Sequence, residues 1–156
     1  ILVKEHLHIL HQQDIKHYVR YLDQGFDCVF GSRTQPNYIY KGAKMQSYLR
    51  YGNILVAKFL SILFMGPKLT DVGCTYKLIS KKSYQKINNQ MVTSGSELQP
   101  ELMIRLILKK VRIIEIPVKY FARKGYSKIT YNFNSSFKVA IKMIILILKL
   151  RFKNFI

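Results

Sequence analysis

Apolar and polar residues alternate along this chain with the periods of helices and short strands. Apolar positions three and four residues apart, or a short polar run of helix-forming residues, predict helices at 14–24, 44–65, 81–87 and 97–110. Asp14 is a candidate N-cap of the first helix, and Gly25 is a candidate for the left-handed residue that ends it. Gly66 and Pro67 are expected to end the second helix.

Runs of β-branched and aromatic residues indicate three short strands, at 26–30, 74–79 and 113–118. In the third strand, Glu115 interrupts an otherwise apolar run. Pro117 removes one hydrogen-bond donor from the ladder, so we expect this strand near a sheet edge or at the point where pairing ends.

A basic segment follows directly on the third strand, with Arg123, Lys124, Gly125, Ser127 and Lys128. Arginine offers a planar fork of donors, lysine a point charge, and glycine lets backbone N–H groups come close to an anion. A loop held by a rigid strand in this way can clamp a phosphate or pyrophosphate. A solvated basic turn is the alternative.

The first strand ends in Gly31, Ser32 and Arg33. A hydroxyl and a cation therefore lie at the carboxyl end of a strand, which is where open α/β sheets bind their ligands. A plain strand-ending turn is the alternative interpretation of this tripeptide.

Acidic residues are few, so their positions carry information. Asp71 precedes a Val-Gly pair and then a strand, where a carboxylate serves as a general base or as an acceptor for backbone N–H groups. From the residues alone, the structural role is favoured. Glu97 and Glu101 lie four residues apart on one helical face, and they also suit the positive end of that helix.

Charge narrows the classes of partner. The chain has 156 residues, 49% of them hydrophobic, with 26 Lys plus Arg against 8 Asp plus Glu, a formal net charge of +18. Such an excess favours a polyanion, an anionic membrane surface or phosphorylated ligands. Cys28 and Cys74 form no disulfide framework and no metal spacing, which favours a reducing compartment. The chain begins without methionine or a signal peptide, and we expect it to be a fragment.

The C-terminal segment, 137–156, is apolar but interrupted by lysines and one arginine. Its uninterrupted apolar part, 143–148, is far too short to span a bilayer core of about 30 Å. We expect a basic amphipathic helix that lies in the interface of an anionic membrane. A helix packed on the domain is the alternative.

Four motifs stand in one order: FDCVFGSR, RYGN, LTDVGCTYKLIS and PELMIRLILKKVRIIEIPVKYFARKGYSK. Through them, over about residues 14–130, the chain resembles the family 2 glycosyltransferases of the GT-A fold. The resemblance is to the branch of dolichyl-phosphate mannose synthase and the polyprenyl-phosphate sugar transferases. It implies an α/β fold, part of a Rossmann-like GT-A domain with a mixed sheet. Residues 1–136 would be the acceptor portion, followed by the amphipathic helix 137–156.

The resemblance also implies partners and phosphate ligands. The donor would be a nucleotide-sugar and the acceptor a lipid phosphate, at the cytoplasmic face of a membrane. The acceptor phosphate would be held by Arg33 with Ser32, and by Arg123 with Ser127 and Lys128.

Three further residues receive roles in the same way. Arg50, in the acceptor-side helix, would add to the phosphate site. Asp71 is the favoured candidate base, and Glu101 would lie close to the reaction centre. Because a lipid phosphate is already anionic, it also stays open that Asp71 orients other groups or repels misplaced charge.

One departure from the family's pattern limits what this chain can do. The family carries a nucleotide-binding strand-helix-strand unit and an Asp-x-Asp motif for a divalent metal, and this sequence contains no Asp-x-Asp. A cofactor, Mg²⁺ or Mn²⁺, is thus implied by the resemblance, with ligands outside this chain. We expect the isolated chain to be inactive.

Two other functions compete with this interpretation. A basic module that binds RNA or DNA would use the same cations and aromatic residues, but no nucleic-acid motif is recognisable and no nucleic acid partner is expected. A degenerate, membrane-associated pseudoenzyme would explain the missing metal motif.

Overall fold

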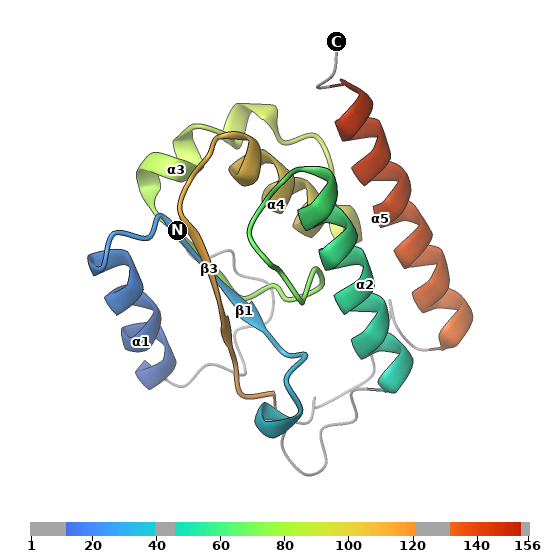
Figure 1. Cartoon of the computed structure of the whole chain (residues 1–156), viewed down its shortest axis with the longest axis horizontal. Helices are drawn as coiled ribbons and strands as arrows, with labels where there is room; N and C mark the ends of the chain where they lie inside the picture. The colour runs from blue at the N-terminus through green and yellow to red at the C-terminus, as the bar shows by residue number, and fades with distance from the viewer. Residues whose placement is uncertain (1–11, 40–45, 121–131, 154–156) are drawn as a thin grey trace.

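The computed structural model describes residues 12–39, 46–120 and 132–153 (Figure 1). Its helices are α1 (Gln12–Asp23), α2 (Ser47–Leu63), α3 (Lys81–Gln85), α4 (Leu98–Leu108) and α5 (Phe133–Lys153). Its strands are β1 (Cys28–Ser32), β2 (Lys77–Ile79) and β3 (Ile113–Pro117). Short 3₁₀ turns lie at η2 (Pro36–Tyr38), η3 (Asn88–Gln90) and η4 (Gly95–Glu97).

The described strands form one mixed sheet in the order β2-β1-β3. β1 pairs in parallel with β3, from Cys28 opposite Ile113 to Ser32 opposite Pro117. β2 runs antiparallel on the other side of β1. The α/β class with a mixed sheet is therefore confirmed, and Pro117 lies on an outer strand of the described sheet, as expected from its missing donor. The parallel pairing brings the carboxyl ends of β1 and β3 to the same end of the sheet.

Several predicted boundaries shift in the structure. β1 begins at Cys28 and continues through Gly31 and Ser32, because these two residues pair with β3 instead of turning. β2 is shorter than expected and starts only at Lys77. The prediction that Asp14 caps α1 is wrong, because two helix-forming glutamines extend the helix upstream and place Asp14 in its first turn.

The two helix ends differ in which residue takes the left-handed conformation. After α1, Gly25 has φ +88°, its N–H donates to Leu22 O at 2.9 Å, and the N–H of Phe26 donates to Tyr21 O at 3.1 Å, as predicted for a glycine-terminated helix. After α2, Met65 takes this conformation with φ 50°, and Gly66 does not.

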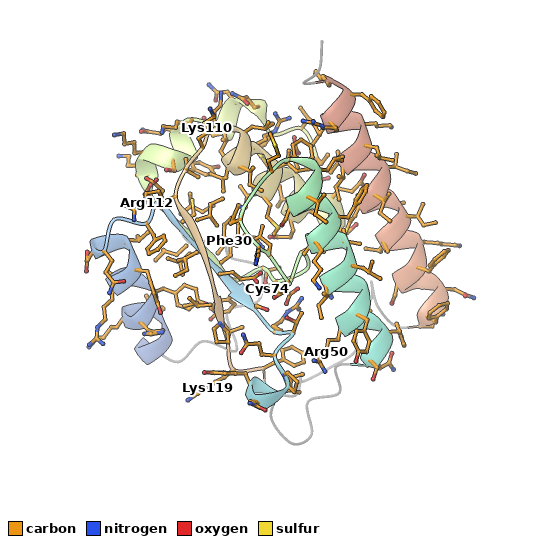
Figure 2. The ribbon with its side chains drawn as sticks, in the orientation of Figure 1. Phe30, Arg50, Cys74, Lys110, Arg112 and Lys119 are labelled. Carbon is orange, nitrogen blue, oxygen red and sulfur yellow. The ribbon has the colours of Figure 1, made fainter. Side chains whose placement is uncertain are left out.

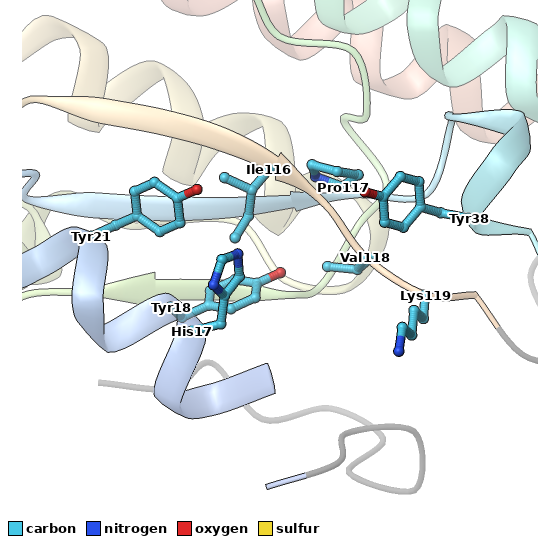
Figure 3. A pocket seen from close by; sticks show the side chains of 8 residues that line it. All are labelled: His17, Tyr18, Tyr21, Tyr38, Ile116, Pro117, Val118 and Lys119. Carbon is cyan, nitrogen blue, oxygen red and sulfur yellow. The ribbon is translucent and has the colours of Figure 1, made fainter. Parts of the chain in front are cut away.

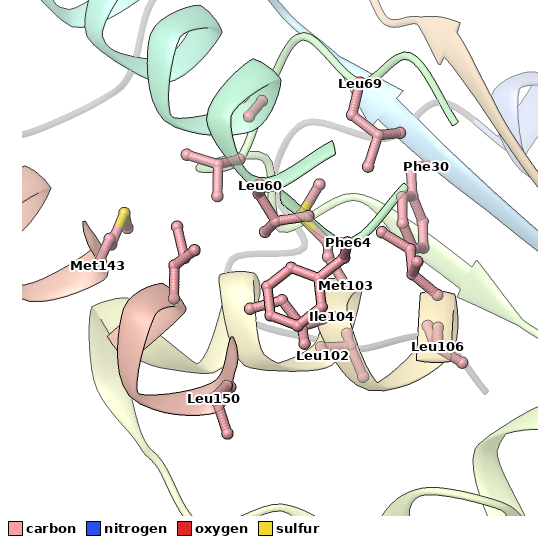
Figure 4. Close-up of a cluster of buried hydrophobic side chains, with 14 of the residues drawn as sticks. Phe30, Leu60, Phe64, Leu69, Leu102, Met103, Ile104, Leu106, Met143 and Leu150 are labelled. Atoms are coloured by element: carbon pink, nitrogen blue, oxygen red, sulfur yellow. The ribbon is translucent and has the colours of Figure 1, made fainter. Parts of the chain in front are cut away.

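The main core lies on one side of the sheet, where Cys28 and Phe30 of β1 share one cluster of buried side chains with α2 and α4, and α5 packs on α2 and α4 (Figure 2 and Figure 4). Its centre includes the fully buried side chains of Phe30, Leu60, Met103, Ile104 and Ile147. α1 covers the other side, where a smaller cluster contains Tyr18, Val29 and Ile116.

The C-terminal helix α5 packs on the domain with one of its faces. Four side chains, Met143, Leu146, Ile147 and Leu150, are buried against α2 and α4. The helix begins at Phe133, upstream of the expected start. The packed alternative is thus correct for this face. None of the described helices is both long enough and apolar enough to cross a membrane.

Gly31 is required by packing, since a Cβ on it would lie 2.7 Å from Tyr18 Oη, 2.8 Å from Tyr76 Cβ and 2.9 Å from Val118 Cγ1. Gly31→Ala is expected to lower the free energy of unfolding by about 1–3 kcal/mol, the usual cost of overpacking. Urea denaturation measures the change. The matched control is Gly52→Ala in α2, where nothing lies within 4 Å of the new Cβ and the helix should gain about 0.5–1 kcal/mol. A Gly31→Ala protein as stable as the parent would contradict the described packing.

Candidate functional site

The candidate site lies where β1 and β3 end, beside the first turns of α2 and the loop that follows α2. The strand ends are tied together beyond the sheet, because Val118 N donates to Ser32 O at 2.9 Å and Tyr120 N donates to Tyr38 O at 2.8 Å. Arg33 therefore follows directly on a strand whose end is held in place by these hydrogen bonds.

Arg33 forms a two-pronged ion pair with Asp71. Nε donates to Oδ2 and one terminal nitrogen to Oδ1, both at 2.9 Å, and the backbone N–H of Arg33 also donates to Oδ2 at 2.9 Å. The Asp71 side chain is 0% exposed and the Arg33 side chain 15%. The guanidinium also lies 5.9 Å from the centre of the Tyr120 ring. Asp71 therefore fixes both the side chain and the backbone of Arg33.

These contacts decide the protonation of Asp71. Burial raises the pKa of its carboxyl, but the charge of Arg33 and the hydrogen bonds from Arg33 outweigh burial and hold the pKa below the ordinary value of 3.8. A general base works best with a pKa near the working pH. The geometry agrees with the structural role that the residues alone favoured for Asp71, and the role as a base that the resemblance implies stays a prediction.

Glu115 of β3 holds the backbone from which Asp71 projects. Its carboxylate accepts from Thr70 N at 2.8 Å, from Thr70 Oγ1 at 2.7 Å and from Asp71 N at 3.1 Å. Burial raises the pKa of Glu115 despite these donors. From the sequence, Glu115 was interpreted only as a polar break in an apolar strand. An acid inside an apolar strand of a chain with few acids was the signal that could have identified it.

Ser32 belongs to a cluster of three hydroxyls. Its Oγ lies 2.8 Å from Thr34 Oγ1 and 2.8 Å from Thr70 Oγ1, and the two threonine oxygens are 3.0 Å apart. Ser32 and Thr34 are buried. The contacts of Ser32 thus join β1 to the loop after α2, while its predicted role as a phosphate ligand stays a prediction.

Arg50 reaches the same place from α2 (Figure 2). Its Nε donates to the backbone carbonyl of Thr34 at 2.7 Å, and its guanidinium lies 5.6 Å from the centre of the Tyr51 ring. The structure therefore brings two arginines, far apart in sequence, to adjacent backbone positions at the end of β1.

Two more residues of the loop after α2 shape the site. A Cβ on Gly73 would lie 2.5 Å from Asn53 Oδ1 and 3.2 Å from a terminal nitrogen of Arg33, so only glycine allows α2 to approach. The buried amine of Lys77 donates to the carbonyl of Cys74 and lies 5.2 Å from the centre of the Phe30 ring. Burial lowers the pKa of Lys77. Lys77 was not predicted as a site residue, and Gly73 was noted only as part of the turn that follows Asp71.

The hydrogen-bond partners of Glu101 in α4 lie in the loop before α4 and on α4 itself. Its fully buried carboxylate accepts from Thr93 N at 2.8 Å, from Val92 N at 3.2 Å and from Arg105 Nε at 2.7 Å. Burial raises its pKa, but the hydrogen bonds from Thr93, Arg105 and Val92 outweigh burial and lower it. None of these partners belongs to the Arg33–Asp71 pair. Glu101 thus fixes the loop before α4, and its predicted place near the reaction centre stays a prediction.

The remaining predicted site residues, Arg123, Ser127 and Lys128, lie outside the described residues. Within the described ranges, no group of three or more His, Cys, Asp or Glu side chains is placed to hold a metal ion. A divalent cation therefore stays an expectation of the resemblance.

A pocket of about 340 Å³ lies on the α1 side of the sheet (Figure 3). It is lined by His17, Tyr18, Tyr21, Tyr38, Ile116, Pro117, Val118 and Lys119. The wall is mainly aromatic and aliphatic, with one histidine and one lysine as its basic residues. It contains none of the predicted phosphate ligands.

One known protein is similar in sequence to this chain. Over 109 residues the chain is 31% identical to a dolichyl-phosphate hexose transferase from Haloferax volcanii. This similarity supports a glycosyltransferase-like relationship. The matched stretch is 69% of this chain and 44% of the relative, so the chain spans less than half of that protein's length. No protein-family model matches the chain, and no solved structure matches it.

Proposed function

We propose that this chain is the acceptor side of a family 2, GT-A-type glycosyltransferase. It would transfer a sugar from a nucleotide-sugar to a polyprenyl phosphate of the dolichyl type, at the cytoplasmic face of a membrane. The observation that carries the proposal is the convergence of Arg33 and Arg50 at the end of β1. The similar protein from Haloferax volcanii is a dolichyl-phosphate hexose transferase, which supports this acceptor.

Both arginines are anchored in the same way. Arg33 Nε bonds to Asp71, and Arg50 Nε bonds to the Thr34 carbonyl. A guanidinium has five N–H donors, and we assign the NH1 donors of Arg33 and the terminal donors of Arg50 to the phosphate. Because each side chain is already held by the protein, little rotational freedom is lost when the phosphate binds.

In this proposal Asp71 positions Arg33 and takes no proton. A phosphate oxygen of the acceptor forms the new bond to the anomeric carbon of the sugar, and the bond from that carbon to the donor diphosphate breaks. The attacking oxygen already carries negative charge, so no base is needed to activate it. An aspartate with a lowered pKa beside a fixed cation suits this role.

Arg50→Ala in the full-length protein is expected to raise the KM for dolichyl phosphate about tenfold or more, because a charge-assisted hydrogen bond contributes about 1.5–3 kcal/mol. Transfer from a panel of radiolabelled nucleotide-hexoses measures the effect. Arg50→Lys should fall between the parent and Arg50→Ala, since lysine keeps the charge but not the fork. Arg20→Ala, an exposed arginine on α1, is the control.

The proposal fails if the parent protein transfers no hexose and binds vesicles containing dolichyl phosphate no better than vesicles containing dolichol. Equal KM values for Arg50→Ala and Arg20→Ala would show that Arg50 does not bind the acceptor phosphate. Retention on RNA that exceeds retention on dolichyl-phosphate vesicles would favour the nucleic-acid-binding alternative.

A further inference from the structure

The outward side of α5 is apolar along its whole length. Six exposed residues recur every three or four positions, opposite the buried face: Phe133, Phe137, Ile141, Ile145, Leu148 and Phe152. Phe137, in the first half of the helix, is 56% exposed. Residues with this spacing lie on one side of a helix. α5 therefore has two apolar faces, of which only one is used by the core.

α2 carries a second, shorter row of exposed apolar residues, Tyr51, Leu55 and Ile62, with Leu55 69% exposed and the exposed Lys58 between Leu55 and Ile62. The two helices run side by side in the same direction (Figure 1), since Tyr48 packs on Phe133 near their first turns and Phe64 lies under Arg151 near their last turns.

The two stripes approach each other near the first turns of their helices. Phe133 belongs to the α5 stripe, contacts Tyr48 of α2 at 5.3 Å between ring centres and stacks on Phe137 at 6.2 Å. We call the combined surface, made of the exposed apolar residues of α2 and α5 named above, the α2–α5 face. Exposed apolar residues that gather on one face in this way mark an interaction site.

Charge defines the partner of the α2–α5 face. Neither helix contains an Asp or Glu. Four exposed lysines form a row along α5 beside the apolar stripe: Lys138, Lys142, Lys149 and Lys153. Apolar side chains with a flanking row of lysines suit a bilayer interface, where the apolar groups enter the acyl boundary and the lysines reach anionic headgroups. A second copy is disfavoured, because it would bring the lysine rows and the +18 net charges together.

We propose that the α2–α5 face docks in the interface of an anionic lipid bilayer, with both helices lying in the membrane plane. Arg50 lies on α2 between Tyr51 of this face and Thr34 of the candidate site. Docking therefore places the two arginines at the depth of lipid phosphates. The link to an acceptor lipid rests on the proposed function, whereas the docking itself does not.

The absence of tryptophan from the sequence allows a direct test. Phe137→Trp places the chain's single tryptophan on the face, where its emission can be excited separately from that of the tyrosines. Val92→Trp is the matched control, because Val92 is 79% exposed in the loop before α4 and belongs to neither helix. With vesicles of phosphatidylcholine and phosphatidylglycerol that carry brominated acyl chains, we expect strong quenching of Phe137→Trp and little quenching of Val92→Trp. Equal quenching of both, or no quenching of Phe137→Trp, would overturn the proposal.

A second pair of variants separates the face from net charge. Lys142→Gln/Lys149→Gln removes two cations from the lysine row, and Lys82→Gln/Lys86→Gln removes two exposed cations from α3 and its C-terminal end. The first pair is expected to weaken partition into anionic vesicles by about tenfold or more, and the second by much less. Equal losses would show that only net charge matters, and so contradict a docking face.

Two further outcomes are distinguishable. If the parent chain is dimeric by sedimentation and Phe137→Gln/Phe152→Gln makes it monomeric without changing vesicle binding, the face binds a second copy and the membrane proposal is wrong. If vesicle docking holds but the full-length protein transfers no sugar, the proposed function fails and the docking face stands.

Discussion

Asp71→Ala is expected to lower the free energy of unfolding by about 3 kcal/mol, at the lower end of the range for breaking a buried ion pair, because Arg33 keeps some access to water. The carboxylate of Asp71 is fully buried and satisfies three donors of Arg33, and it also accepts from Gly73 N at 3.1 Å. Removing it leaves a cation and two backbone donors with no acceptor.

Equilibrium urea denaturation followed by circular dichroism measures this change. Asp23→Ala, an exposed aspartate at the end of α1, should change the free energy by no more than about 0.5 kcal/mol. The double variant Arg33→Met/Asp71→Leu should recover the part of the loss that comes from the unpaired cation, although Arg33 N and Gly73 N still lack their acceptor. A double variant as unstable as Asp71→Ala would show that the loss does not come from the ion pair.

The same pair predicts acid sensitivity. The folded-state pKa of Asp71 lies below its unfolded value, so its contribution to stability is fully present above about pH 4 and is lost as the pH falls through the folded-state pKa. Glu115, with a raised pKa, acts in the opposite sense: its contribution is present below the ordinary value of 4.5 and is lost as the pH rises through its folded-state pKa. The comparison is therefore parent against Asp71→Asn, in which Glu115 is common to both. The difference in stability should shrink as the pH is lowered below 4, and a constant difference would contradict the lowered pKa.

Glu101→Ala is expected to lower the free energy of unfolding by about 3–5 kcal/mol, because a buried charged network loses its acceptor. Val92 N, Thr93 N, Thr93 Oγ1 and the guanidinium of Arg105 all donate to this one carboxylate. Urea denaturation measures the loss. Glu97→Ala, one turn earlier and partly exposed, is the matched control and should have a much smaller effect.

Glu101→Gln separates a structural role from a catalytic one. Glutamine keeps the shape and one acceptor oxygen, so part of the network survives. If Glu101 only fixes the loop before α4, sugar transfer per folded molecule in the full-length protein should stay within about threefold of the parent, well short of the 10²–10⁴-fold loss that follows removal of an acid–base group. A loss of about a hundredfold in sugar transfer, with an unchanged fold, would indicate that Glu101 acts at the reaction centre.

Local pattern was enough to predict that these helices and strands exist, though not all of their boundaries, because most of them bury a face whose period can be recognised in neighbouring positions. Arg33 and Asp71 were identified in the same way, from a cation after one strand and a carboxylate before another. Their mutual ion pair was not, because it joins residues 38 positions apart. Glu115 was missed for the same reason, since its role depends on Thr70 and Asp71, 45 and 44 positions away.

The amino-acid order by itself determined the α/β class, the excess of cations and the amphipathic character of the last helix, since each depends on composition or on positions within one or two turns. Only the tertiary structure decided that Arg33 and Arg50 meet at one strand end, that Asp71 serves Arg33 and that α5 shares an apolar face with α2. The reason is physical: hydrogen bonds, ion pairs and side-chain burial between distant segments depend on distances in space that no local period encodes.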